Sequence, residues 1–274
     1  MDFGFLPPPP PLADIVKTVW FARGSQAEFA HAEPIVPDGC VELVFNLSEP
    51  FEQVDGAGLR QRQARDLLIG PSLQPTTAVP TGDVDLLGLR LRPGRTSAFF
   101  ETPMSSLTDR LIPMSSVLPG SDRLLDNLRE QRVEQRLDYL GDAFGERARR
   151  SGKRGSLASV ATALDAIATR HGAVSIKALA AAAGVSSRHL ERRFREEVGL
   201  GAKQIARIAR VQHALSMMAR CPAWSGADVA AWCGYADQAH LIREFTALTG
   251  STPARLTTTS RSLAAFMRRP DSPS

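Results

Sequence analysis

The sequence predicts an α+β protein of two domains. The N-terminal domain is expected to be a small β-sandwich or barrel with flanking helices, and the C-terminal domain to be all-α. Short apolar runs separated by Pro and Gly precede Ser121, whereas helical periodicity follows it. Within the helical part, one pattern occurs twice. The length of 274 residues fits two domains.

Apolar segments of the N-terminal half are the candidate strands. They lie at residues 41–47, 67–71 and 84–91, and residues 12–21 are expected to form a strand or a short helix. In the last candidate, leucines alternate with Gly88 and Arg90, which predicts one buried face. Residues 7–11 are all proline, so we expect a stiff polyproline II lead-in there.

Residues 121–149 carry an apolar stripe at helical spacing, which predicts a helix or a pair of helices. The stripe either packs on the β-rich part or forms a dimer seam. The absence of strict heptads favours packing. With this segment the N-terminal domain covers residues 1–150, and the Ser- and Gly-containing residues 151–156 are the predicted linker.

Residues 157–258 form the predicted helical domain, followed by a flexible tail at 259–274. Two helix-turn-helix units, at about 175–198 and 227–248, are joined by a long helix that ends near Arg220. A single unit of this kind is a weak signal, because ordinary helical hairpins look similar. Two matched copies are a strong signal. The residues expected in the core of the two units are Leu190, Phe194, Trp232, Tyr235, Leu241 and Phe245.

The second helix of each unit carries the repeated pattern. His189 begins the segment HLERRF, and His240 begins HLIREF 51 positions later. Gly199 and Gly250 follow the two segments at the same offset. Such self-similarity at a fixed offset indicates one supersecondary unit that is used twice.

The first copy predicts a helix with one apolar and one basic face. It follows a turn at Gly184, and Leu190 and Phe194 fall four residues apart on one side. The opposite side is rich in arginine. A helix of this kind fits the major groove of DNA, where guanidinium groups match guanine edges and phosphates.

Charge is distributed unevenly between the two halves. Residues 151–274 hold 17 Lys and Arg against 8 Asp and Glu, whereas residues 1–150 hold 16 against 21. This asymmetry indicates a polyanionic partner for the C-terminal half, although a solvated basic surface would have the same composition.

The helical part of the sequence, over roughly residues 157–256, resembles the DNA-binding domain of the AraC/XylS family of bacterial transcription regulators. In the first copy the matching residues are Leu179, Ala180, Gly184, Val185, Ser186, His189, Leu190, Arg192, Phe194, Gly199, Arg207, Arg210, Ala214 and Leu215. In the second copy they are Val229, Ala230, Cys233, Gly234, Tyr235, Asp237, Gln238, Leu241, Arg243, Glu244, Phe245, Gly250, Thr252, Pro253 and Arg255. Leu241 in place of the usual Phe, and Ala202 where Pro is frequent, are departures that affect packing only.

The N-terminal half resembles the β-rich, cupin-like domain of one branch of this family, through residues 37–47 and 69–94. The two resemblances imply a sequence-specific, DNA-binding transcription regulator that is cytoplasmic and needs no cofactor. Its expected partners are double-stranded DNA, a second copy of the chain, RNA polymerase and an unidentified small-molecule effector. The N-terminal domain is expected to sense a signal or to mediate dimerisation.

The resemblance also implies which residues meet DNA. The residues expected to contact bases are Arg188, Glu191, Arg192, Gln238, Ala239, Ile242 and Arg243, and those expected to contact phosphates are Ser186, Lys203 and Arg207. Arginine suits guanine, glutamine suits adenine, glutamate suits cytosine, and the apolar side chains suit a thymine methyl group. For each arginine, the alternative is a surface charge or a phosphate contact.

Other classes of function find less support in the sequence. An enzyme with an attached DNA-binding domain is the main alternative, with Cys40 as its candidate nucleophile, and a protein-binding basic face is a second. No metal is expected, because His189 and His240 are single histidines within packing motifs and the N-terminal half holds only His31. The cysteines lack zinc-type spacing, and no apolar run or leader indicates a membrane span or a secretory signal.

Overall fold

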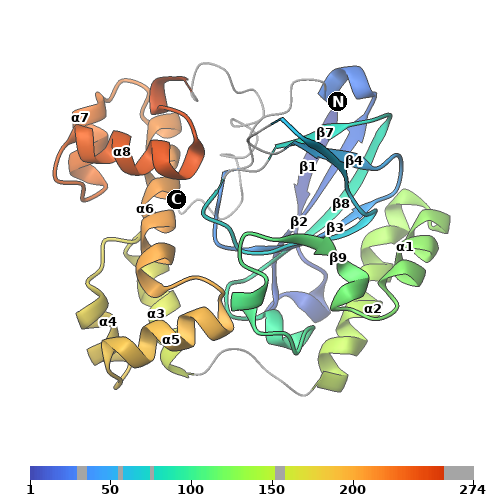
Figure 1. The fold of residues 1–274 in the computed structure, drawn as a ribbon, viewed down its shortest axis with the longest axis horizontal. Coiled ribbons are helices and arrows are strands. Elements are labelled where there is room, and N and C mark those ends of the chain that lie inside the picture. The colour runs from blue at the N-terminus through green and yellow to red at the C-terminus, as the bar shows by residue number, and fades with distance from the viewer. Residues whose placement is uncertain (30–35, 55–57, 75–76, 152–157, 256–274) are drawn as a thin grey trace.

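The computed structural model describes residues 1–29, 36–54, 58–74, 77–151 and 158–255. The residues up to Ser151 form a β domain, and those from Ala158 form a helical domain beside it (Figure 1). This arrangement confirms the predicted fold class. Among the described helices, none combines the length and the hydropathy that a membrane span requires.

The β domain is built on a six-stranded antiparallel sheet. Its strands, in spatial order, are β1 (Asp2–Leu6), β2 (Val16–Gly24), β8 (Val84–Leu91), β3 (Val41–Asn46), β6 (Asp66–Ile69) and β9 (Leu111–Pro113). Leu87, Leu89 and Leu91 of β8 are buried in the domain core, but the prediction of a single buried face was wrong, because Gly88 and Arg90 on the other face are buried as well. Gly88 lacks a side chain where the ring of Trp20 crosses the sheet, since a Cβ there would lie 2.1 Å from that ring.

The strands of a second, three-stranded sheet were not among the candidates that the sequence offered. Its order is β5 (Arg60–Arg62), β4 (Phe51–Val54) and β7 (Thr77–Pro80). All three residues of β5 are exposed, and the strand carries no apolar alternation that would reveal it. The cupin-like character of the domain remains a prediction.

The N-terminal residues are more ordered than a polyproline lead-in, which corrects that expectation. β1 precedes the prolines, and Pro10–Leu12 form a short 3₁₀ helix, η1. Proline fits the first turn of a helix because the amide groups there need no intrahelical acceptor. Pro9 packs against Gly141, where a Cβ would lie 2.7 Å from the proline ring. The proline segment therefore contacts the helix that carries Gly141.

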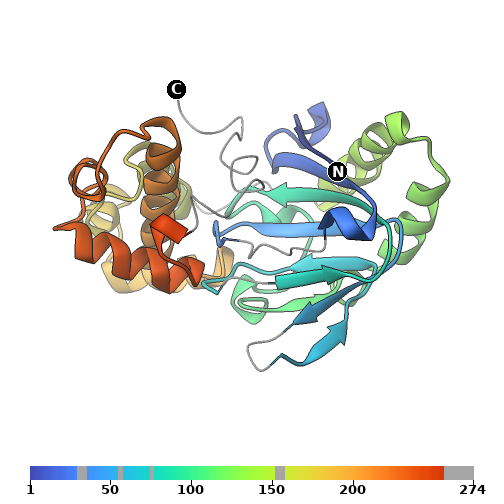
Figure 2. The ribbon, with the colours of Figure 1, turned by 90° about the horizontal axis from the view of Figure 1, so that it is seen from above.

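That helix belongs to the predicted helical pair, α1 (Ser121–Glu130) and α2 (Arg136–Ser151). Leu128, Leu140 and Phe144 are buried in the same core as the main sheet, which agrees with the packing alternative. Both helices lie on the side of the β domain away from the helical domain (Figures 1 and 2).

The helical domain holds six helices among the described residues. They are α3 (Ala158–Thr169), α4 (Ile176–Ala182), α5 (Ser187–Glu197), α6 (Ala202–Arg220), α7 (Gly226–Trp232) and α8 (Gln238–Thr249). α6 runs through the domain and contributes to two hydrophobic clusters. The larger one also includes α3, α4, α5 and the last turns of α8, and the smaller one includes α7 and the start of α8. Trp232 was expected in the core but is 64% exposed and packs edge-on against Trp224, which corrects that assignment.

Candidate nucleic-acid interface

The turns and ends of the two helix-turn-helix units have the same backbone geometry. Gly184 and Gly234 lie in the turns with φ of 67° and 72°. Gly199 and Gly250 follow α5 and α8 with φ of 89° and 69°. These values lie in the left-handed region, which glycine adopts without steric cost. The repeat in the sequence is therefore a repeat in structure.

Equivalent side chains cap the two second helices. The hydroxyl oxygen of Ser186 accepts a hydrogen bond from the backbone N–H of His189 at 3.2 Å. In the second unit, Asp237 Oδ1 accepts from the backbone N–H of His240 at 2.6 Å. Each cap satisfies one otherwise unpaired donor of the first turn and fixes where the helix begins.

The apolar sides of both helices are buried, as predicted. Leu190 and Phe194 of α5, and Leu241 and Phe245 of α8, are almost fully removed from solvent. Since one side of each helix faces the core, the opposite side faces outward. We call α5 and α8 the reading helices.

Most of the expected base-contacting residues lie on these outward sides. The exposed ones are Arg188, Arg192, Gln238, Ala239 and Arg243, and Ile242 is half-buried. Arg192 forms an exposed ion pair with Glu196 at 3.6 Å, which costs little to break. The Gln238 side chain lies over α7, because a Cβ on Gly226 would stand 2.6 Å from its Nε2 atom.

Glu191 has a structural role that the sequence did not reveal. Its carboxylate accepts hydrogen bonds from the backbone N–H groups of Ala202, at 3.2 Å, and Lys203, at 3.4 Å. These are the first residues of α6, whose N-cap is Gly201. Glycine has no side chain to accept such bonds, so the carboxylate of α5 caps the long helix instead.

Arg207 connects the long helix to the second reading helix. Its Nε atom donates to Glu244 Oε1 of α8 at 2.8 Å, and the carboxylate side chain is largely buried. One turn further along α6, Arg210 donates to the carbonyl oxygen of Gly172 at 3.1 Å and lies over the Tyr235 ring. Burial raises the pKa of the Tyr235 hydroxyl, which keeps it neutral. Lys203 and Ser186, the other expected phosphate contacts, are exposed.

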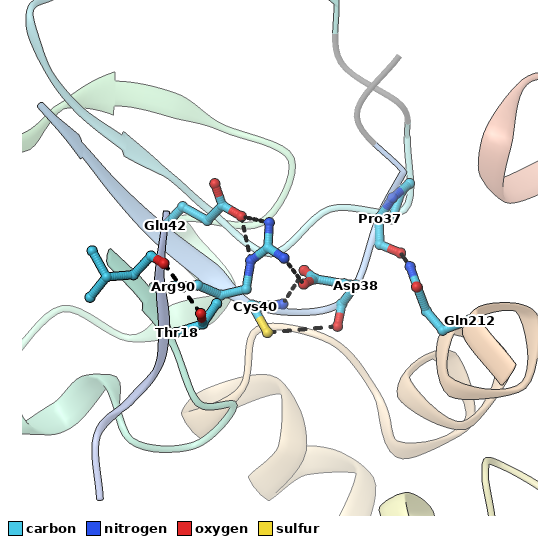
Figure 3. Close-up of polar contacts among 8 residues, drawn as sticks. Thr18, Pro37, Asp38, Cys40, Glu42, Arg90 and Gln212 are labelled. Atoms are coloured by element: carbon cyan, nitrogen blue, oxygen red, sulfur yellow. Dashed lines mark hydrogen bonds and ion pairs between the residues drawn. The ribbon is translucent and has the colours of Figure 1, made fainter. Parts of the chain in front are cut away.

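The segment before β3 packs against the helical domain. Val36 is buried in the hydrophobic cluster of the helical domain. The carbonyl oxygen of Pro37 accepts a hydrogen bond from Gln212 Nε2 of α6 at 2.8 Å (Figure 3). Gly39, with φ of 72°, approaches α6 so closely that a Cβ would lie 2.8 Å from Ile205. Residues 36–40 are thus one part of the β domain that packs on α6.

A buried ionic cluster holds this segment in place. Arg90 of β8 donates from Nε to Glu42 Oε1 at 2.6 Å, and its Nη1 lies 3.3 Å from Asp38 Oδ2 (Figure 3). Asp38 Oδ1 also accepts from the backbone N–H of Cys40 at 3.1 Å. Burial opposes the charge of Arg90, yet the carboxylates of Asp38 and Glu42 raise its pKa above the ordinary value. We call Asp38, Glu42 and Arg90 the ionic cluster.

A second contact lies at the end of the first reading helix. Thr108 Oγ1 donates to the carbonyl oxygen of Gly199 at 2.7 Å. A Cβ on Gly199 would lie 2.6 Å from the Pro71 ring, so the two domains meet closely at this glycine. Gly199 therefore ends α5 and also contacts the β domain.

Comparison with known proteins supports a DNA-binding class. A family model described as a helix-turn-helix domain matches residues 179–259, and one described as a domain of unknown function matches residues 5–113. No curated protein matches the chain. Solved structures of ToxT from Vibrio cholerae share its overall arrangement loosely. One is 10% identical over 91% of this chain and 97% of ToxT, with a TM-score of 0.49. Another, bound to (E)-4-(8-methylnaphthalen-1-yl)but-3-enoic acid, is 10% identical over the same shares, with a TM-score of 0.46.

The C-terminal part of the chain is thus a helix-turn-helix domain, as its resemblance implied. The protein is a DNA-binding transcription regulator with a β-rich N-terminal domain.

Proposed function

We propose that the protein reads two successive segments of the DNA major groove, one with α5 and one with α8. The observation that carries this proposal is the geometric equivalence of the two units on one continuous helix. In Figure 1 the reading helices lie towards opposite ends of α6. α6 has 19 residues, which makes it about 28 Å long at the usual rise of an α-helix. This length is comparable to the roughly 34 Å of one DNA turn.

The exposed side chains of the reading helices suit base recognition. Arg192 and Arg243 occupy equivalent positions of the repeat, and each can donate two hydrogen bonds to a guanine. Gln238 can pair with adenine, and Ala239 and Ile242 offer apolar contact to a thymine methyl group. Arg188, in the first turn of α5, extends the basic surface of the first unit.

The other residues that were expected to contact DNA fall into two groups, according to whether their side chains already bind protein groups. We assign Glu191 to capping α6 and Arg207 to bracing α8, since both side chains already bind protein groups. Ser186 and Lys203 are exposed beside the first reading helix, which suits phosphate contact.

The β domain controls how the helical domain is presented to DNA, in response to a small molecule and within a homodimer that contacts RNA polymerase. The direct support for this control is the interface formed by residues 36–40.

The enzyme alternative requires Cys40 to act as a nucleophile. Cys40 is only 5% exposed, in the segment that packs on α6, and its Sγ atom lies 3.9 Å from the Asp38 carbonyl oxygen. A thiol in this position is not accessible to a DNA substrate while the domains are together. We expect Cys40→Ser to bind DNA as tightly as the wild-type chain does in an equilibrium titration. A loss of binding in this variant, together with transfer of an alkyl group from alkylated DNA to the Cys40 thiol of the wild-type chain, would favour the enzyme.

The affinity of arginine variants for DNA tests the proposed reading helices. The probe is a duplex selected in vitro by the wild-type chain, and a scrambled duplex measures non-specific binding. Arg192→Ala and Arg243→Ala should each weaken specific binding by about 1–3 kcal/mol and leave non-specific binding nearly unchanged. Arg195→Ala, an exposed arginine of α5 outside the proposed set, is the matched control. Equal losses of affinity for both duplexes would show that the two arginines contact phosphates and do not read bases.

A further inference from the structure

A cleft of about 480 Å³ opens on the β domain, beside the last turns of α2. Its floor includes Phe99, Leu118 and Phe144, which are all buried and belong to the domain core. The rings of Phe99 and Phe144 meet edge to face, with centroids 5.0 Å apart. A cleft of this volume with an apolar floor has the size and character of a small-molecule site.

The cleft is lined by the carboxylates of Glu101 and Glu146 and by the guanidinium groups of Arg147 and Arg150. Glu146 and Arg150 form an ion pair with each other at 2.5 Å. Arg147, one residue away, also lines the cleft, and no carboxylate of the described residues lies within ion-pair distance of it. Burial lowers the pKa of the Arg147 guanidinium, because the group has lost part of its hydration.

We propose that this cleft binds a small organic carboxylate. The apolar body of the ligand, an aromatic ring or a compact hydrocarbon, lies against Leu124 and Ala143, the partly exposed apolar residues of the lining. Its carboxylate pairs with Arg147, whose planar guanidinium can donate two parallel hydrogen bonds. A neutral ligand of the same shape would bury the same apolar area but form no ion pair with Arg147, so the charge sets the specificity of the site.

The position of the cleft connects binding to regulation. α2 ends at Ser151, which lines the cleft together with Arg147 and Arg150. A carboxylate bound to Arg147 holds this last turn against Phe99, at the point where the chain leaves the β domain. This regulatory role rests on the proposed function, whereas binding of the carboxylate does not.

Calorimetric titration of the full chain tests the site. The probes are 3-phenylpropionate, benzoate and cyclohexylacetate, and 3-phenylpropanol is the neutral match of the first. At least one carboxylate should bind saturably and raise the melting temperature, and 3-phenylpropanol should bind at least tenfold more weakly than 3-phenylpropionate. Arg147→Gln should weaken carboxylate binding tenfold or more, and Ala143→Leu should weaken it by filling the cleft. Arg149→Gln, an exposed neighbour outside the cleft lining, should bind like the wild type.

Two results would overturn the inference. One is the absence of saturable binding for all three carboxylates. The other is undiminished binding by Arg147→Gln when circular dichroism shows that the variant is folded. The same preparations are titrated with the selected duplex. Intact DNA binding with no carboxylate binding rejects this site alone, whereas carboxylate binding without specific DNA binding rejects the proposed function and leaves the site standing.

Discussion

The two helix-turn-helix units share one backbone geometry but are stabilised by different contacts. The first unit contacts the β domain at Gly199, and the helix that follows it packs on residues 36–40. The second unit is attached to α6 by a small apolar cluster, by Phe245 and Leu248 in the larger cluster that also holds α5, and by the Arg207–Glu244 ion pair. The difference indicates that a change in the β domain reaches the first unit directly and the second unit through α6.

The outward sides of the two reading helices differ as well. α5 presents Arg188, Arg192 and Arg195, whereas α8 presents Gln238, Ala239 and Arg243. Phosphate attraction depends on positive charge, while amide and methyl groups read base edges. The first unit should therefore supply more of the electrostatic affinity, and the second more of the uncharged base recognition.

The largest effect is expected from breaking the ionic cluster. Arg90→Met leaves Asp38 and Glu42 buried without their counter-charge, which should lower the free energy of unfolding of the β domain by about 3–5 kcal/mol. Urea unfolding measures this loss. Hydrogen exchange should show that residues 36–40 and α5 lose protection before α8 does. Arg23→Met, which breaks a partly exposed pair with Asp85, is the matched control and should cost less than about 1 kcal/mol. Equal loss of protection in α5 and α8 would contradict the unequal coupling of the two units.

A smaller effect is expected from acid at the joint between α3 and α6. The rings of His171 and His213 stack with centroids 4.0 Å apart. Burial, with His171 and Arg220, lowers the pKa of His213 to about 4. Because the unfolded chain binds this proton near its ordinary pKa of about 6.5, stability should fall as the pH drops from 7 towards 4.

The loss at this joint should be roughly 1–2 kcal/mol, after allowance for solvent screening of a half-exposed ring. Thermal unfolding at several pH values measures it. His213→Gln should flatten the profile, because the substituted side chain does not titrate. A profile that is as steep in His213→Gln as in the wild type would assign the acid sensitivity to other groups.

The smallest change in stability is expected from replacing single carboxylates, one in each unit. Glu191→Ala removes the cap of α6 and should lower the free energy of unfolding by about 1 kcal/mol, as is typical of a lost helix cap. Glu244→Ala, in the second unit, removes the partner of Arg207 and is the comparison variant. Neither substitution should change the base preference found by in vitro selection. A relaxed preference at one base pair in Glu191→Ala would instead support the contact between Glu191 and cytosine that the sequence led us to expect.

Much of the helical domain could be predicted from the sequence because its signals are local. Helical periodicity, the capping Ser186 and the turn glycines each specify nearby backbone, and the repeat makes each copy support the other. Arg192 and Arg243 face outward because the apolar residues on the opposite side of each helix are buried. Trp232 was misplaced because an aromatic residue inside an apolar helix pattern indicates burial in most proteins.

The contacts between distant segments could not be predicted in the same way. The bonds from Glu191 to α6 depend on a turn that brings α5 against the next helix. The ionic cluster depends on the register of β3 and β8, which places Glu42 opposite Arg90. Short strands such as β5 lack the alternating apolar residues on which a strand prediction rests.

Selection of DNA sites by the wild-type chain, Arg192→Ala and Arg243→Ala tests the central claim most directly. Each chain is incubated with random duplexes, and the bound sequences are compared. The account predicts that each variant loses base preference at a different position, with the two positions about 10 base pairs apart. Relaxation of the same position in both variants, or unchanged preferences with uniformly weaker binding, would contradict the two-part reading of DNA by α5 and α8.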